Sequence, residues 1–182
     1  MLNALRVITY LLRGRVRLWQ CYTNVTWRTC AACLRWHGRI VADPSAFPDH
    51  DGCEHKLLQF PVWKLAAFRE KGRRMAERAE AELTRRKLFQ EAILLLPQDG
   101  ERAADLFDQA GAVDVYLPEL ERLAAEQAAL LQANPALRSR LGEVFLYRWK
   151  AKFAKDRYER QPELARTQQE RWGVQRIKEL FP

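Results

Sequence analysis

Four residues of the kinds that bind metal ions lie close together near the start of the chain: Cys30, Cys33, His50 and Cys53. Two residues separate Cys30 from Cys33, a spacing that lets two thiolates reach one ion from a single tight turn. His50 and Cys53 repeat that spacing with an imidazole and a thiolate. Because tetrahedral Zn²⁺ takes four nitrogen or sulfur ligands in closed structural sites, this pattern predicts one bound zinc ion.

His55 is a fifth candidate ligand, because it lies two residues beyond Cys53. It could replace His50 or orient a ligand through a hydrogen bond, and the sequence leaves open which four of the five bind. A disulfide and unligated thiols are the alternatives. We expect reduced thiols, since arginines crowd the apolar residues 2–12 and this stretch has neither a signal-peptide pattern nor the length of a membrane span. Cys21 is expected to be a small buried apolar residue.

The common catalytic patterns are missing from the sequence. There is no glycine-rich phosphate loop, no Gly-x-Ser-x-Gly turn and no His-Glu-x-x-His helix. His37, next to Gly38, is expected to be a turn residue or a hydrogen-bond donor to a ligand. The pair Asp49-His50 is similar to part of an HNH-type nuclease site, but no downstream Asn and His complete that site. We therefore predict no catalytic residue and no enzyme activity.

The net charge of +8 is spread unevenly over the 182 residues. Residues 1–42 contain seven arginines and no acidic residue, residues 43–146 are mildly acidic, and residues 147–182 are basic again. Arginine pairs with phosphates and carboxylates through its planar fork. Basic charge is unspecific, so nucleic-acid contact and an ordinary solvated surface both remain open, and no nucleic-acid-binding residue is identified.

Apolar periodicity predicts a mainly α fold, with several long helices and a small zinc-clipped β element near the N-terminus. Residues 22–27 and Ile40-Val41 are expected to be strands, and residues 43–55 a loop that the metal would hold. We divide the chain into residues 1–60, the basic segment and zinc knuckle, and residues 61–182, the helical region.

Helix boundaries follow from capping residues and prolines. A long helix runs from Val62 to Pro97, with a solvated basic face and a favourable Glu70–Arg74 pair. A short helix is expected to begin after Asp99 and to end at Gly111. Further helices are expected at residues 2–12, 118–134, 137–153 and 163–180. The last has few apolar residues, so we expect a C-terminal arm that needs a partner to be ordered, whereas the aromatic residues between 145 and 158 are expected to pack.

Residues 25–60 resemble the C-terminal motif of phage head-morphogenesis proteins, the Mu-like minor head proteins. The residues that match the motif are Cys30, Cys33, Gly38, His50 and Cys53. Asp51 stands where the family usually has proline, and His55 stands where it has its last cysteine, so the capacity to bind metal is kept.

The resemblance implies a structural minor virion protein of a tailed phage. Such a protein would lie at the portal, the capsid interior or the head–tail junction and would act in particle assembly. Its partners would be portal, capsid or tail-connector subunits, with packaged DNA as a further contact of the basic ends, and no membrane. It would be oligomeric in the virion and present in the host cytoplasm before assembly. The alternatives are a zinc-containing nucleic-acid-binding protein and, less favoured, an HNH-type nuclease.

Overall fold

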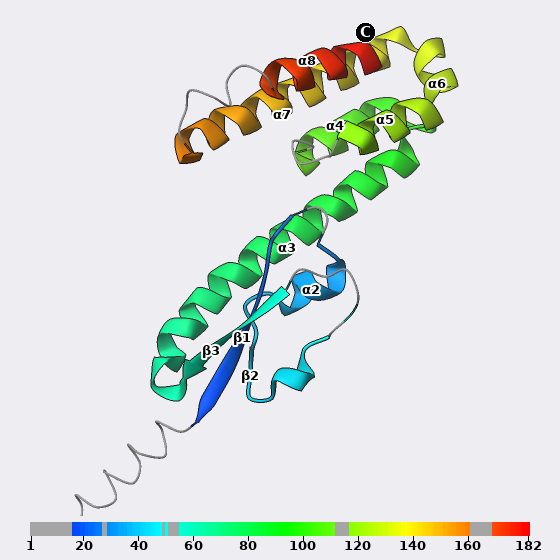
Figure 1. The fold of residues 1–182 in the computed structure, drawn as a ribbon. Helices are drawn as coiled ribbons and strands as arrows, with labels where there is room; N and C mark the ends of the chain where they lie inside the picture. Colours follow the sequence, from blue (N-terminus) through cyan, green and yellow to red (C-terminus); the bar gives the residue numbers. More distant parts are fainter. Residues whose placement is uncertain (1–15, 27–28, 49, 51–54, 112–116, 161–168) are drawn as a thin grey trace, which may run out of the picture. The chain divides into compact units, whose positions relative to one another are not determined.

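A computed structural model describes residues 16–26, 29–48, 50, 55–111, 117–160 and 169–182 (Figure 1). The described chain is mainly helical, with one three-stranded antiparallel sheet near its N-terminus, which confirms the predicted fold class. It divides into two compact units, residues 1–83 and 84–182, and the boundary falls within the long helix α3 (Leu65–Leu95). The helix predicted at residues 2–12 lies outside the described residues.

The sheet of the first unit has the strand order β2–β1–β3. Its central strand, β1 (Arg17–Thr23), pairs with β2 (Ile40–Val41) on one side and with β3 (His55–Pro61) on the other. The β1–β3 pairing extends over the full length of both strands. The central strand is thus held along both edges and can carry residues for both faces of the sheet.

The strand predictions are partly correct. β2 was predicted, but β1 begins and ends earlier than the expected strand at residues 22–27. β3 was not predicted, because the adjacent Leu57 and Leu58 break the alternation of polar and apolar residues that marks a half-buried strand. Both leucines are partly buried, so each face of β3 is covered.

Different helices cover the two faces of this sheet. On one face α3 packs against the strands: Phe60 stacks on Phe68 with ring centroids 3.9 Å apart, and Gln20 Nε2 donates a hydrogen bond to the Phe68 carbonyl oxygen at 2.8 Å. On the other face lies α2 (Ala31–Trp36), with Cys21 buried beneath it. Successive strand residues point to opposite faces, so the neighbours Gln20 and Cys21 serve different layers.

The turn after α2 approaches α3 so closely that both residues at the contact are glycines. A Cβ atom at Gly72 would lie 2.4 Å from the Gly38 carbonyl oxygen, and Gly38 has a φ of 85°. The Gly38 N–H donates to the Cys21 carbonyl oxygen, and the Cys21 N–H donates to the Arg39 carbonyl oxygen, both at 2.9 Å. Two residues therefore oppose one, which is a β-bulge with glycine at its left-handed position. This bulge directs the chain from α2 into β2.

The long helix α3 has the exposed charged surface that its sequence predicts. Arg74 Nε lies 3.0 Å from Glu70 Oε1, which confirms the expected pair. Arg73 also bonds Glu70, and it bonds Glu77 as well. Such exposed pairs contribute little to stability, so this helix is held mainly by its apolar stripe, in which Met75 and Ala79 are buried.

The second unit contains the end of α3 and a bundle of further helices. They are α4 (Gly100–Ala110), α5 (Leu117–Glu126), α6 (Ala128–Ala133), α7 (Pro135–Arg160) and α8 (Gln169–Leu180). As predicted, Asp99 caps α4 by accepting from the Arg102 N–H at 3.1 Å, and Gly111 ends it with a φ of 58°. The single helix expected at residues 118–134 is interrupted at Gln127, where α5 ends and α6 begins.

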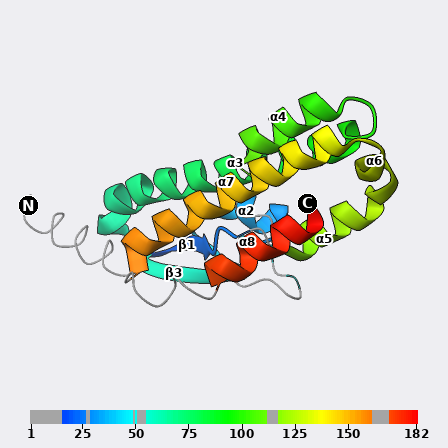
Figure 2. The same ribbon diagram turned by 90° about the horizontal axis from the view of Figure 1, so that it is seen from above.

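The C-terminal helix belongs to the core of this second unit. α8 packs against α7 and α5, and it lies beside α7 in both ribbon views (Figures 1 and 2). Ile177 and Phe181 are buried, and the Phe181 ring lies 5.3 Å from the Phe145 ring, centroid to centroid. The expectation of an arm that needs a partner is therefore wrong. These few apolar residues are enough, because Gly173 lets α8 come close to Trp149.

Gly72→Ala should destabilise the first unit. The new methyl group would meet the Gly38 carbonyl oxygen and the Gln20 amide, and overlap of this kind in a packed site costs roughly 1–3 kcal/mol. Glu80→Ala, at an exposed position on the same helix, is the control and should change stability by less than about 0.5 kcal/mol. Urea unfolding followed by tryptophan fluorescence measures both. Equal stability of the two variants would contradict the close contact.

Candidate metal centre

Cys30, Cys33 and His50 come together beside α2. Their ligand atoms all lie within 4.8 Å of one another. His50 Nε2 is 3.0 Å from Cys30 Sγ and 3.5 Å from Cys33 Sγ. Zinc bond lengths of about 2.3 Å to sulfur and about 2.0 Å to nitrogen place tetrahedral sulfur and nitrogen ligands about 3.5 Å apart. The three side chains could therefore hold one metal ion between them.

The local fold of α2 explains why both sulfurs face the same side. Cys30 is the capping residue of α2, and its Sγ accepts a hydrogen bond from the Cys33 N–H at 3.3 Å. Cys33 lies three residues later, which is close to one helical turn, so the two sulfurs point in similar directions. A hydrogen bond to sulfur also favours the thiolate, the form that binds metal.

His50 reaches the sulfurs from the segment that connects β2 to β3. The Asp43 carboxylate accepts a hydrogen bond from the Ser45 N–H at 2.9 Å, which starts a short turn and lowers the pKa of Asp43. Phe47 follows this turn, is buried, and contacts the Trp36 ring edge-on with centroids 5.9 Å apart. Phe47 thus anchors the segment three residues before the imidazole.

Of the other two predicted ligands the structure describes only His55, and His55 is not part of this group. Cys53 lies outside the described residues. His55 begins β3, where it pairs with Thr23, and its ring lies 4.3 Å from the Phe47 ring, centroid to centroid. Within the described part of the chain, the group contains no fourth Cys, His, Asp or Glu.

Cys21 matches its prediction as a small buried residue. It is fully buried in the small core that also contains Cys33 and Phe47. Burial raises the pKa of its thiol to about 11, against the opposing effect of the positive charge of Arg39. Cys21, Cys30 and Cys33 form no disulfide with one another in the structure.

His37 lies in the turn after α2, which is one of its two predicted roles, and it makes a contact that the sequence did not indicate. It is buried, and its Nδ1 accepts a hydrogen bond from the Thr23 N–H at 3.0 Å. An acceptor nitrogen has no proton, so the neutral ring carries its proton on Nε2. Burial lowers the pKa of His37, and the positive charge of Arg78 lowers it further. His37 therefore ties the end of α2 to β1, which differs from the predicted hydrogen-bond donor to a metal ligand. Gly38 signalled only the turn.

Comparison of the chain with protein-family models, curated proteins and solved structures gives no match. The candidate centre is therefore supported by the geometry of Cys30, Cys33 and His50. Among the described helices, none is long and apolar enough to cross a membrane.

The buried His37 should make stability depend on pH. Because the folded-state pKa lies below the ordinary value of 6.5, the unfolded chain takes up this proton first as the pH falls. The contribution of His37 to stability is complete above about pH 6.5 and decreases as the pH falls toward the lowered pKa of the folded state.

The matched variant is His37→Asn, which keeps an acceptor oxygen near the Nδ1 position and does not titrate. Urea unfolding of both proteins between about pH 7.5 and pH 5 should show a steeper loss in the wild type. Protonation of the metal ligands is common to both proteins and cancels in the difference. Parallel pH profiles would contradict the neutral, buried state of His37.

Proposed function

We propose that this chain is a non-catalytic structural protein whose first unit is held by one zinc ion, and that it is a minor virion protein acting in the assembly of a tailed phage particle. The convergence of Cys30, Cys33 and His50 carries the proposal. These are three of the residues through which the chain resembles the minor head proteins, and His50 is 17 residues from Cys33, so only folding brings it to the two cysteines.

Zinc suits this donor set better than other common cations do. Two thiolates and an imidazole are ligands for zinc, whereas magnesium and calcium prefer oxygen. Cys53, three residues after His50, is the fourth ligand in this proposal, since it repeats the spacing of Cys30 and Cys33. Four protein ligands would leave no open position for a substrate, as in structural zinc sites.

The surroundings of the centre support a non-catalytic role. His37 is buried and engaged with the Thr23 amide, so it is poorly placed to exchange protons with a substrate. His55 lies against Phe47 at the start of a strand. The bound ion would instead join α2 to the segment that carries His50, and this link would stabilise a small unit.

Exposed aromatic residues of the second unit support contact with other subunits. The exposed fraction is 66% for Tyr147 on α7 and 59% for Trp172 on α8. Large aromatic side chains are enriched at protein interfaces, where they bury much area for little loss of conformational entropy. In the proposed role these residues contact portal, capsid or tail-connector subunits.

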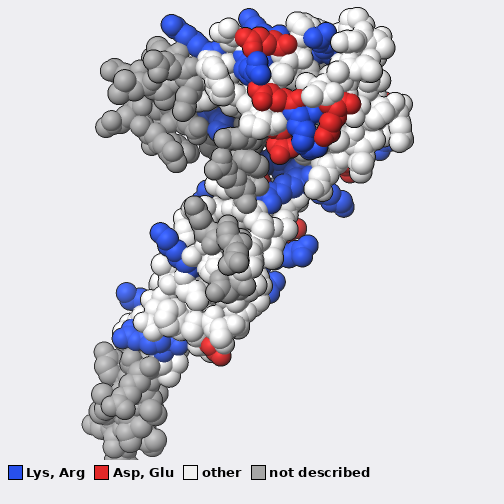
Figure 3. All heavy atoms as spheres, turned by 45° about the vertical axis from the view of Figure 1, so that its right-hand side comes forward, with Lys and Arg blue, Asp and Glu red and all other residues white. Residues whose placement is uncertain are grey.

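A nucleic-acid-binding protein is the second candidate, and the charge of the first unit favours it. Basic side chains predominate on the face of this unit shown in Figure 3, whereas acidic and basic side chains lie next to each other on the second unit. In the second unit, Arg122 bonds Glu119 and Glu126, and Arg176 bonds Glu121 and Glu179. Contact with DNA would therefore involve the first unit.

Metal analysis of the reduced protein should find about one zinc ion per chain. Cys30→Ser and His50→Ala should each lower the zinc content strongly, because each removes a ligand. Cys21→Ala is the matched control, since it removes a buried cysteine outside the centre and should leave the zinc content unchanged. Less than about 0.2 zinc per wild-type chain would contradict the proposed ion.

The assembly role predicts that the chain is present in purified phage particles at a fixed ratio to a portal, capsid or tail-connector subunit. Quantitative mass spectrometry of particles measures this ratio. Absence from particles, together with binding of DNA by the isolated monomer that weakens steeply as salt is raised, would favour the nucleic-acid-binding alternative. DNA cleavage that depends on metal and on His50 would favour the nuclease.

A further inference from the structure

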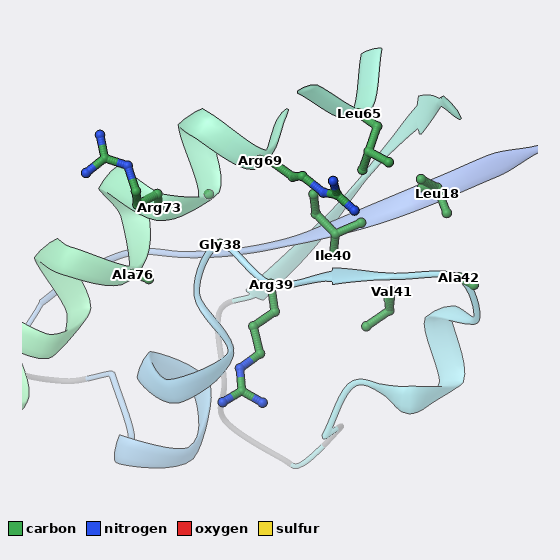
Figure 4. Close-up of a pocket in the computed structure, with 11 residues that line it drawn as sticks. Leu18, Gly38, Arg39, Ile40, Val41, Ala42, Leu65, Arg69, Arg73 and Ala76 are labelled. Carbon is green, nitrogen blue, oxygen red and sulfur yellow. The ribbon is translucent and has the colours of Figure 1, made fainter. Parts of the chain in front are cut away.

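A groove of about 550 Å³ lies along the open edge of the sheet in the first unit, between β2 and α3 (Figure 4). β2 is the edge strand, so no further strand of the described chain pairs with its outer side. The groove is lined by apolar side chains of β1, β2 and α3, among them Leu18, Ile40, Leu65 and Ala76. The close contact of Gly38 and Gly72 also contributes to its wall. All these residues belong to one unit, so the groove is a property of that unit alone.

One positive charge in this groove is not used by the fold. The Arg69 guanidinium extends from α3 to a position close to Ile40 (Figure 4), and it makes no hydrogen bond or ion pair with another residue that the structure describes. Arg73 is already engaged by Glu70 and Glu77. Arg39 points away from α3, and its guanidinium lies 5.2 Å from the centroid of the Trp36 ring.

None of the described residues that line the groove is acidic, so no carboxylate among them neutralises Arg69. A guanidinium beside apolar side chains favours an occupant that supplies a carboxylate, because the pair forms two parallel charge-assisted hydrogen bonds. The occupant must also bring small apolar groups to cover Leu18, Ile40 and Leu65. A single free guanidinium is a poor match for a nucleic-acid backbone, which is bound by several cations in a row.

The backbone of β2 adds a third element of recognition. The Arg39 carbonyl oxygen accepts a bond from Cys21, and Val41 lies opposite Trp19. In an antiparallel pair the residues that bond the partner strand alternate, so the N–H and C=O of Ile40, between these two positions, point away from β1. An extended peptide beside β2 could pair with them, as in complexes where a peptide adds to a sheet edge.

We infer that this groove binds an extended acidic segment of a partner protein, with a carboxylate on Arg69, small apolar side chains against Leu18, Ile40 and Leu65, and its backbone beside Ile40. This inference goes beyond the proposed function, since it states the chemistry of the partner. It does not depend on zinc, because Ile40 and Gln20 lie opposite each other on the α3 side of the sheet, whereas the metal centre lies on the α2 side.

The test is a fluorescence-polarisation titration of the full-length protein with a labelled decapeptide that alternates glutamate and valine. The same peptide with lysine in place of glutamate and a ten-nucleotide oligothymidine are the comparison probes. We expect saturable binding of the acidic peptide and no saturable binding of the two comparison probes. Amide chemical shifts in the protein should change at Gly38–Ala42 and along α3 from Leu65 to Ala76.

Two variants with the same loss of charge separate a specific site from general attraction. Arg69→Gln removes the guanidinium in the groove and should weaken peptide binding roughly 10-fold or more, as expected for a lost hydrogen bond to a charged group. Arg74→Gln removes an exposed guanidinium of the same helix outside the groove and should leave affinity within about two-fold. Both variants should retain the wild-type zinc content, so failure here is distinguishable from failure of the zinc proposal.

Several results would overturn the inference. Equal weakening by Arg69→Gln and Arg74→Gln would show unspecific attraction, and no binding of the acidic peptide would show that the groove does not take such a segment. Competition by oligothymidine at similar concentrations would make the surface a nucleic-acid site. A concentration-dependent dimer in sedimentation that Arg69→Gln abolishes would make a second copy of the chain the occupant.

Discussion

The meeting of two sulfurs and one imidazole is the constraint on which the first unit depends. The small core beside them has only a few buried members among the described residues, namely Cys21, Cys33 and Phe47. A core of this size supplies little of the free energy that ordering the connecting segment costs, and small units commonly need a cross-link or a metal. Cys33 contributes both to the core and to the candidate metal site, since it is buried in the core while its sulfur faces His50. The capping bond from the Cys33 N–H orients the Cys30 sulfur.

β1 is the element that connects the metal centre with the rest of the unit. Its residues alternate between the two faces, so Cys21 contacts the core beside α2 while Gln20 binds the α3 backbone. The bulge at Gly38 and Arg39 interrupts the ladder next to the same cysteine, and Gly38 then lies against Gly72 of α3. The groove along β2 is therefore shaped by the same turn that follows the metal-binding helix. The groove on the α3 side of the sheet and the candidate metal site on the α2 side are therefore separated by the strand β1.

The second unit is stabilised in a different way. Its buried side chains form one continuous apolar cluster from α3, α4, α5, α6, α7 and α8, with Phe107 and Phe145 in edge-on contact at 5.4 Å between centroids. Arg148 bonds both the Asp108 carboxylate and its backbone carbonyl oxygen, which ties α7 to the end of α4. Outside this core, Tyr147 and Trp172 are exposed and available for contacts with other molecules. The first unit thus contains a candidate metal site beside a small core, whereas the second unit has a larger helical core.

The sequence alone determined features that depend on near neighbours. The spacing of Cys30 and Cys33, the cap at Asp99 and the stop at Gly111 are set within one or two turns of chain, and periodicity is enough to show a mainly helical protein. Tertiary structure alone decided which candidate ligands meet, that His37 accepts a bond from Thr23, that residues 55–61 form a strand, and that Ile177 completes a core. The open edge of β2 beside Arg69 also emerges only from the assembled sheet. These features depend on pairings between distant segments, whose energies come from packing and burial that no local pattern records.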